Sequence, residues 1–480
     1  MYGKDQYDWN FISPPQPKLN NRTIPQARGR MLGGSSLLNF LMVVYPSKAS
    51  IDAWGALGNG GWNYDALAPY YRKFAKTHPP SQNAREFCRL DGLCIQGISA
   101  AETGPLAVTF GEGFGPNNAA WFDAFEELGL NMATDPRTGM AGTRTSAVSA
   151  YLTPKRIILE PVVSGDNVEF VAKGVEIRSE DGSNRRVGAR NEVILAAGAL
   201  HTPQILELSG IGSRELLEKH GVPVLIDNPN VGEHMQDHPV VAENFEVADS
   251  VTSGDMLRDP ALIQAVVAQY QANQEGPLSQ SIISSAYVPM ADSSGVLSTD
   301  ARRQLLDRHL GAATKCSEAE RGVIRAILET DNEAAYQCLL FPMQSNIMDN
   351  PTHVGEYLVP VLPENYLTIM TILNYPFSRG SCHIVSPHVE DKPVWDPRYN
   401  DEDIDMELLV RGVQFVSKLV ATQPLRKIIK EGGKRSSEGE SLDAAKDVVR
   451  KRQVSVFHST VYAVAERAAD IIKKDRENAE

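Results

Sequence analysis

Three short stretches of the chain carry residues whose types and spacing could do chemistry. The first, Gly29–Asn39, reads Gly-Arg-Met-Leu-Gly-Gly-Ser-Ser-Leu-Leu-Asn. The second begins at Gly198 and reads Gly-Ala-Leu-His-Thr-Pro-Gln-Ile-Leu-Glu-Leu-Ser-Gly-Ile-Gly, and the third is Val-Phe-His-Ser-Thr around His458. Loops dense in Gly and Ser let backbone N–H groups approach a phosphate or a heteroaromatic edge. An imidazole can take a proton from a nearby hydroxyl at neutral pH.

Both glycine motifs resemble the hallmark blocks of the GMC (glucose-methanol-choline) flavin oxidoreductases, and the stretch 61–73 is also similar to that family. The resemblance extends over most of the chain and is strongest to fungal members, including dehydrogenases of secondary-metabolite pathways. It implies FAD as the cofactor and the removal of a hydride from the CH-OH group of a small organic alcohol. Taken alone, each glycine motif also fits an ordinary packing turn without a ligand.

The resemblance further implies which residues contact FAD and which one acts as the base. The implied flavin contacts are Leu32, Gly33, Gly34, Ser35, Asn39, Phe40, Leu41, Met42, Gly198 and Ala199. His458 is the implied catalytic base, since it resembles the start of the family's His-Pro/Ser-x-Gly-Thr stretch. The alternative for His458 is a leftover residue that has lost its catalytic partner.

Two parts of the family pattern are missing from the sequence. The Gly-x-Gly-x-x-Gly motif that holds a dinucleotide after a first strand is not found. Its nearest candidate, Gly111–Gly115, has its third glycine one residue early and is followed by Pro116, so we interpret it as a loop. Between His458 and a helix-like segment at 461–472, several dozen family residues are missing, and a smaller contraction is expected near 155–175.

These gaps leave alternatives open for the function. One is a family member that keeps FAD but performs non-redox work, as a cyclase or lyase. Another is a catalytically inactive remnant, or a mis-spliced version of a longer enzyme.

The elements that must position these motifs predict an α/β fold. The apolar run 192–197 predicts a strand that enters Gly198, and a helix over 202–208 follows it, as in a doubly wound sheet. We expect an incomplete Rossmann-like FAD-binding domain, plus a substrate domain with an antiparallel sheet and helices. The predicted division is 1–240 for the FAD-binding region, 241–455 for the substrate domain and 456–480 for a remnant of the C-terminal FAD segment.

Periodicity and capping signals predict further elements along the chain. A strand is expected at 367–373, and Lys430–Lys451 is expected to be a surface excursion because it is charged and low in apolar residues. The other expected helices lie at 65–76 (with Asn63 as its cap), from Ser213 to Gly221, at 258–272, at 300–330, around Leu409–Val420 and at 460–474.

The amino-acid composition narrows the classes of binding partner. A net charge of -13 and a pI near 5.4 argue against nucleic acid or an anionic membrane surface. No apolar stretch reaches the roughly 20 residues that span a bilayer. The small-molecule alcohol that the resemblance implies is the expected partner. The polar N-terminus is not a secretory signal, and the sequence leaves localisation, electron acceptor and oligomeric state open.

Cysteines and paired histidines suggest no further site. The five cysteines do not form a disulfide framework, although Cys88 and Cys94 either bridge a short loop or are two unrelated thiols. His234 and His238 flank Asp237 at a spacing that could suit a metal, but the segment looks like the family's loop into the substrate domain. We therefore expect no metal site.

Overall fold

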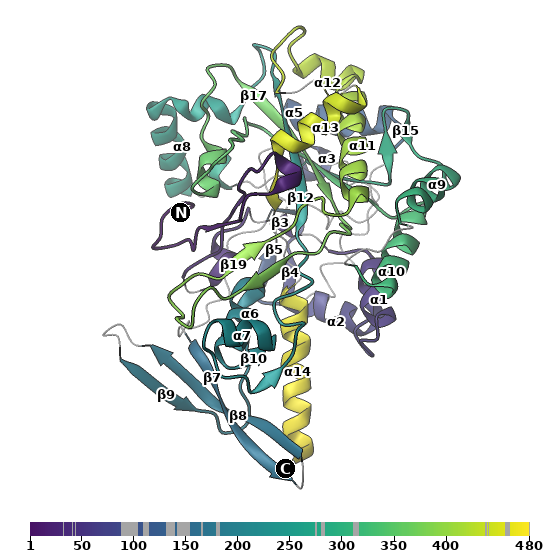
Figure 1. Cartoon of the computed structure of the whole chain (residues 1–480). Helices are drawn as coiled ribbons and strands as arrows, with labels where there is room; N and C mark the ends of the chain where they lie inside the picture. Colours follow the sequence, from purple (N-terminus) through teal and green to yellow (C-terminus); the bar gives the residue numbers. More distant parts are fainter. Residues whose placement is uncertain are drawn as a thin grey trace.

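The computed structural model places the elements shown in Figure 1. It describes residues 1–31, 33–40, 42–43, 45–87, 104–108, 115–130, 140–141, 154–164, 167–178, 183–273, 276–279, 284–310, 316–436, 439, 441–456 and 461–479.

The largest sheet is five-stranded, and each of its neighbouring pairs is antiparallel. Its order is β13 (Ser284–Val288), β16 (Tyr336–Phe341), β17 (Tyr366–Leu373), β12 (His238–Glu246) and β20 (Gln453–Val456). The strand predicted at 367–373 is confirmed by β17. Because successive side chains alternate between the two faces of a strand, Val240 and Val241 enter different apolar clusters on opposite faces.

Helices cover one face of this sheet. They are α5 (Pro116–Glu127), α11 (Asp403–Val420), α12 (Gln423–Ile428) and α13 (Leu442–Arg452), and with the sheet they enclose the largest apolar core. Within α11, Leu409, Val413 and Val416 are fully buried, as the helical spacing predicts. Burial of each such side chain contributes about 1.5–3 kcal/mol.

The predicted surface excursion at 430–451 is wrong over its last part. Residues 442–452 form α13, and Ala445, Val448 and Val449 are buried against the core. Ser441 caps the helix, because its hydroxyl accepts a hydrogen bond from the N–H of Ala444 at 3.2 Å. The charged residues of this segment lie on the outer side of an amphipathic helix, which the overall composition of the segment concealed.

A three-stranded antiparallel sheet lies below α6 and α7 in Figure 1. It is formed by β7 (Pro154–Ser164), β8 (Asn167–Arg178) and β9 (Asn184–Gly188), and α6 (Gly198–Leu208) and α7 (Arg214–Lys219) follow it. Helix α7 agrees with the helix predicted between Ser213 and Gly221, where Gly221 has a φ of +67°.

The strand predicted at 192–197 is wrong, since this run has no regular secondary structure. Among the described residues the parallel pairs are β4 (Ala75–Thr77) with β5 (Leu106–Val108) and β10 (Ile211–Gly212) with β11 (Ile226–Asp227). Within the part of the chain that the structure describes, neither parallel pair includes this run, and Ile194 is 64% exposed.

The C-terminal helix packs against an early helix. Helix α2 (Tyr64–Phe74) begins after Asn63, whose side-chain oxygen accepts from the N–H of Ala66 at 3.1 Å, as predicted. Helix α14 (Val461–Ala479) confirms the helix predicted at 460–474 and lies beside α2. Lys73 of α2 lies 3.1 Å from Glu466 and 2.9 Å from Asp470 of α14.

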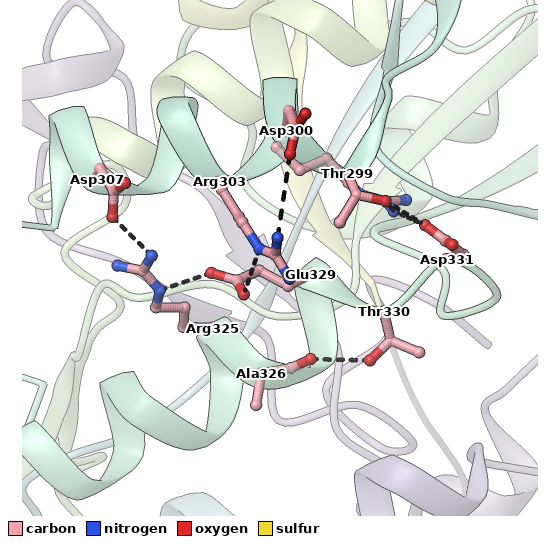
Figure 2. Close-up of polar contacts among 10 residues, drawn as sticks. Thr299, Asp300, Arg303, Asp307, Arg325, Ala326, Glu329, Thr330 and Asp331 are labelled. Carbon is pink, nitrogen blue, oxygen red and sulfur yellow. Dashed lines mark hydrogen bonds and ion pairs between the residues drawn. The ribbon is translucent and has the colours of Figure 1, made fainter.

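The single helix predicted at 300–330 is two helices, α9 (Thr299–His309) and α10 (Glu318–Glu329). A polar network joins them (Figure 2). Arg325 donates to Asp307 at 2.6 Å and to Glu329 at 2.7 Å, and Glu329 also accepts from Arg303 at 3.4 Å.

The remaining elements are short or peripheral. They are β1 (Phe11–Ile12), β2 (Pro25–Gln26), β3 (Met42–Val43), α1 (Lys48–Ala56), α3 (Gln82–Phe87), β6 (Met140–Ala141), α8 (Pro260–Asn273), β14 (Ala291–Asp292), β15 (Gly295–Val296), β18 (Ser381–His383) and β19 (Val394–Asp396). The expected fold class, a mixed α/β protein with an antiparallel sheet and helices, is confirmed. The predicted domain boundaries stay a prediction.

Candidate functional site

The glycine–serine loop folds back on itself so tightly that only glycine fits at its base. A Cβ built on Gly29 would lie 2.3 Å from the carbonyl oxygen of Gly34. Gly33 and Gly34 have φ values of +89° and +52°, a region that L side chains rarely adopt. Ser35 closes the loop by accepting from the N–H of Gly29 at 3.1 Å, and Ser36 donates to the Gly33 carbonyl at 2.6 Å. The loop therefore has a defined shape set by backbone contacts.

The start of α6 offers backbone donors. Gly198 has a φ of +81°, and nothing lies within 4 Å of the position that a Cβ would take. Gly198 and Ala199 are exposed, and the residue at the N-cap, Ala197, makes no side-chain cap. The first N–H groups of a helix have no partner within the helix, and the positive end of the helix dipole favours an anion there. This end of α6 is therefore suited to a phosphate.

Trp9 brings the two glycine motifs together. Its ring lies 4.6 Å from the guanidinium of Arg30 in the first motif and 4.6 Å from the ring of His201 in the second. The N–H of Trp9 also donates to the carbonyl of Arg28 at 2.8 Å, which pairs the N-terminal segment with the base of the glycine loop. This role of Trp9 could not be predicted from the sequence, because nothing in its local pattern indicates a contact with position 201.

His201 has an open ring nitrogen at this junction. Its Nδ1 lies 2.9 Å from Oε1 of Gln204, whereas its Nε2 is buried and has no hydrogen-bond partner. Burial lowers the pKa of His201, and the positive charge of Arg28 acts in the same direction. A neutral imidazole with a free nitrogen can donate to or accept from a bound group.

The residues after the glycine loop lie against the face of the large sheet opposite the helices. Phe40 stacks on Tyr2 with ring centres 5.9 Å apart and meets Phe341 of β16 edge-on at 6.3 Å. Met42 and Phe341 pack against the apolar cluster on this face, which comprises Val240, Leu339, Tyr357, Ile372 and Val454. This second face is therefore the surface next to which the proposed flavin-ring residues lie.

His458 lies outside the described residues, as do Leu32 and Leu41. The strand before it is described: β20 pairs with β12, so that Ser455 lies opposite Pro239 and Val456 opposite His238. The hydroxyl of Ser455 donates to Oδ2 of Asp237 at 2.7 Å and accepts from the amide of Gln26 at 2.8 Å. Cys88, Cys94 and most of the loop at 111–115 also lie outside the described residues.

Asp237 is the centre of a buried polar cluster beside β20. Tyr399 and Ser455 both donate to its carboxylate, and Arg28 interacts with it electrostatically. Burial raises the pKa of Asp237, whereas these donors and the positive charge oppose that rise. In the sequence, Asp237 was considered only as part of a metal-like spacing with His234 and His238. Within the described residues, no group of three or more His, Cys, Asp and Glu side chains is arranged to hold a metal ion.

The chain matches known proteins in three comparisons. Residues 16–240 match the family model described as GMC oxidoreductase. A dehydrogenase of Monascus purpureus, mpl7, is 28% identical over 564 residues, which cover 99% of this chain and 88% of that protein. Since that alignment is longer than the 480 residues of this chain, the relative contains segments that have no counterpart here.

Solved structures share the fold. An FAD-dependent oxidoreductase from Chaetomium thermophilum superposes with a TM-score of 0.73 at 23% identity, covering 95% of this chain and 82% of that one. A fungal aryl-alcohol oxidase gives a TM-score of 0.73 at 20% identity, covering 94% and 79%. None of the helices in the described residues has both the length and the apolarity needed to cross a membrane.

Proposed function

We propose that the chain is a GMC-type oxidoreductase with FAD as its cofactor, and that it oxidises the CH-OH group of a small organic alcohol. The observation that carries the proposal is the meeting of two glycine motifs, distant in sequence, on either side of Trp9. One motif offers a loop of defined shape in which Gly33 and Gly34 carry no side chain, and the other offers the first N–H groups of a helix. We propose fungal secondary metabolism as the setting, since the similar protein mpl7 is a fungal dehydrogenase.

The described residues fit FAD at two places. Gly198 and Ala199 provide backbone N–H groups at the start of α6, and Gly33 and Gly34 present no side chain in the loop, which together suit a pyrophosphate. Nε2 of His201 is a buried polar atom still in need of a partner at the same junction. Asn39, Phe40 and Met42 would lie on the ring side, next to the face of the large sheet opposite α11 and α13. We propose that Leu32, Ser35 and Leu41 also contact FAD.

In the proposed reaction the alcohol loses a proton and a hydride and becomes a carbonyl compound. FAD, when bound, supplies the hydride acceptor. We propose that the imidazole of His458 takes the hydroxyl proton, since a base near neutral pKa works well at physiological pH. The bonds between Ser455, Asp237 and Gln26 hold β20 on the sheet. They anchor the strand that precedes His458 in the sequence.

Flavin content is the first test. The purified full chain is incubated with excess FAD and desalted, and its visible spectrum and released cofactor are measured. Stoichiometric FAD that is bleached anaerobically by an alcohol supports the proposal. Consumption of a substrate while the flavin stays oxidised would favour a cyclase or lyase instead. A chain that retains no FAD is not an oxidoreductase, which is the expected result for a remnant.

A variant pair tests the role of His458. His458→Asn should slow flavin reduction by about 10²–10⁴-fold without loss of bound flavin, because general-base catalysis contributes that much. His388→Asn is the control, since His388 is exposed and distant in sequence from both glycine motifs. Equal reduction rates in both variants would exclude His458 as the base.

A further inference from the structure

Arg22 is a buried arginine that uses only one edge of its guanidinium. Its side chain is 2% exposed, and Nη1 donates to the carbonyls of Arg450 and Gln453, both at 3.1 Å. These two bonds satisfy carbonyls at the end of α13. Nε and Nη2, in contrast, are buried and have no hydrogen-bond partner. Together Nε and Nη2 form a fork that matches the two oxygens of a carboxylate.

Tyr357 adds a third open donor beside this fork. Its side chain is buried, and its hydroxyl likewise makes no hydrogen bond of full geometry. The phenol of Tyr357 lies close enough to the guanidinium of Arg22 for a charge interaction and a weak side-chain hydrogen bond between the two groups. Buried polar groups without partners are costly, so such a set of donors calls for a bound water, an ion or a ligand group.

The open fork lies on the sheet face that we assign to the flavin ring. Tyr357 belongs to the apolar cluster against which Met42 and Phe341 pack. Phe341 in turn meets Phe40 edge-on. A small ligand held at Arg22 would therefore extend along this face toward the proposed ring-side residues.

An exposed carboxylate marks the approach to the fork. Oδ1 of Asp349 lies 3.7 Å from Nε of Arg22, which is beyond hydrogen-bond distance, and its side chain is 84% exposed. Asp349 therefore marks the side of the buried guanidinium that lies nearest to solvent. A carboxylate from outside would have to compete with Asp349 for the positive charge of Arg22.

We infer that Nε and Nη2 of Arg22 and the hydroxyl of Tyr357 bind a carboxylate of the substrate. The inference rests on the proposed function and narrows it to alcohols that also carry an acid group, such as aromatic or aliphatic hydroxy acids. The charge of the guanidinium would hold the acid end of the substrate. The apolar cluster would then cover its carbon body.

Binding of benzoate, measured by calorimetry on the full chain, tests the site without any turnover. Benzyl alcohol of similar shape serves as the neutral probe. Tyr357→Phe should weaken benzoate binding about two- to tenfold, because it removes one neutral donor and leaves the ring packed. Arg22→Lys should weaken it about tenfold or more, because lysine cannot form the two-pronged contact. Neither change should alter binding of benzyl alcohol.

Asp349→Asn tests the inference in the opposite direction, because this change should strengthen benzoate binding. Removal of the competing carboxylate should tighten benzoate binding by up to about fivefold, and the gain should shrink at high salt. Asp300→Asn is the matched control, because Asp300 is an exposed aspartate 4.0 Å from the surface residue Arg303. It should leave benzoate binding unchanged. No saturable binding of benzoate, or equal binding by wild type and Tyr357→Phe, would mean that the open donors hold water only and would overturn the inference.

Substrate preference separates this inference from the proposed function. On the FAD-loaded chain, 4-(hydroxymethyl)benzoate should reduce the flavin with a KM at least about tenfold below that of benzyl alcohol. A preference for the neutral alcohol would overturn the acid assignment and leave alcohol oxidation intact. Benzoate binding without flavin reduction by either alcohol would overturn the proposed function, and with it the assignment of this site to a substrate.

Discussion

His383 of β18 is joined to Glu207 of α6 through a 2.7 Å contact between its Nδ1 and Oε1 of the glutamate. The second oxygen of Glu207 accepts from the N–H of Ile384 at 2.9 Å, and Nε2 of His383 lies 3.0 Å from Glu233. Glu207 is fully buried within the second glycine motif. The imidazole therefore connects the helix that begins at Gly198 with the loop that leads into β12.

This relationship predicts a pH-dependent stability. The hydrogen bond to Glu207, and then that to Glu233, raise the pKa of His383 above its ordinary value near 6.5. The protonated form is thus favoured in the folded state, so the contribution is full below pH 6.5 and is lost as the pH rises through the higher folded pKa. His383→Gln should cost about 1–3 kcal/mol at pH 5.5 and clearly less at alkaline pH, measured by urea unfolding. The exposed His388→Gln is the control. An equal cost of His383→Gln at all pH values would contradict the prediction.

The shape of the glycine loop predicts a marked contrast between two glycine substitutions. Gly29→Ala places a Cβ 2.3 Å from a backbone oxygen, which neither strand of the loop can avoid without moving. We expect a loss of about 1–3 kcal/mol in the free energy of unfolding, as for other overpacked sites. Gly60→Ala is the control, because nothing lies within 4 Å of the added methyl group. Similar stabilities of the two variants would show that the loop is less tightly closed than described.

The sequence predicted the elements whose signal is local and missed those that depend on distant partners. Asn63 and the α2 helix, β17 and α14 were predicted because capping and periodicity lie within one segment. The run 192–197 has a strand-like sequence, yet it lacks a neighbouring strand among the described residues, and no local pattern reveals a missing partner. The buried face of α13 was hidden by its many charges.

The site was predicted only in the part that resembles known motifs. The glycines were found because a tight turn requires that residue type. Arg22 and Tyr357 are more than 300 residues apart in the sequence, so only folding brings their open donors together. The same holds for Trp9 and His201, and for Glu207 and His383.

The hydroxyl of Ser455 should contribute more to the free energy of unfolding than the hydroxyl of a surface serine. Its hydroxyl bridges Gln26 and the buried Asp237, so Ser455→Ala leaves a buried acceptor and a buried donor each short of a partner. We expect a loss of about 1–3 kcal/mol in unfolding free energy. Ser294→Ala is the control, because Ser294 donates to Asp292 at 2.6 Å in an exposed position and should cost under about 0.5 kcal/mol. If both variants lose the same small amount, Ser455 does not hold β20 in place.

The ion-pair network between α9 and α10 should stabilise the fold only modestly (Figure 2). Glu329 accepts from Arg303 and Arg325, but the two arginine side chains are 54% and 35% exposed, so solvent screens both pairs. Glu329→Gln should therefore cost about 0.5–1 kcal/mol at low salt, and the cost should fall as salt rises. A double-mutant cycle of Glu329→Gln with Arg325→Met isolates the stronger pair, for which we expect a coupling of about 0.3–1 kcal/mol. A coupling well above this range that persists in high salt would mean that the pair is shielded from water, and α9 and α10 would then move as one unit.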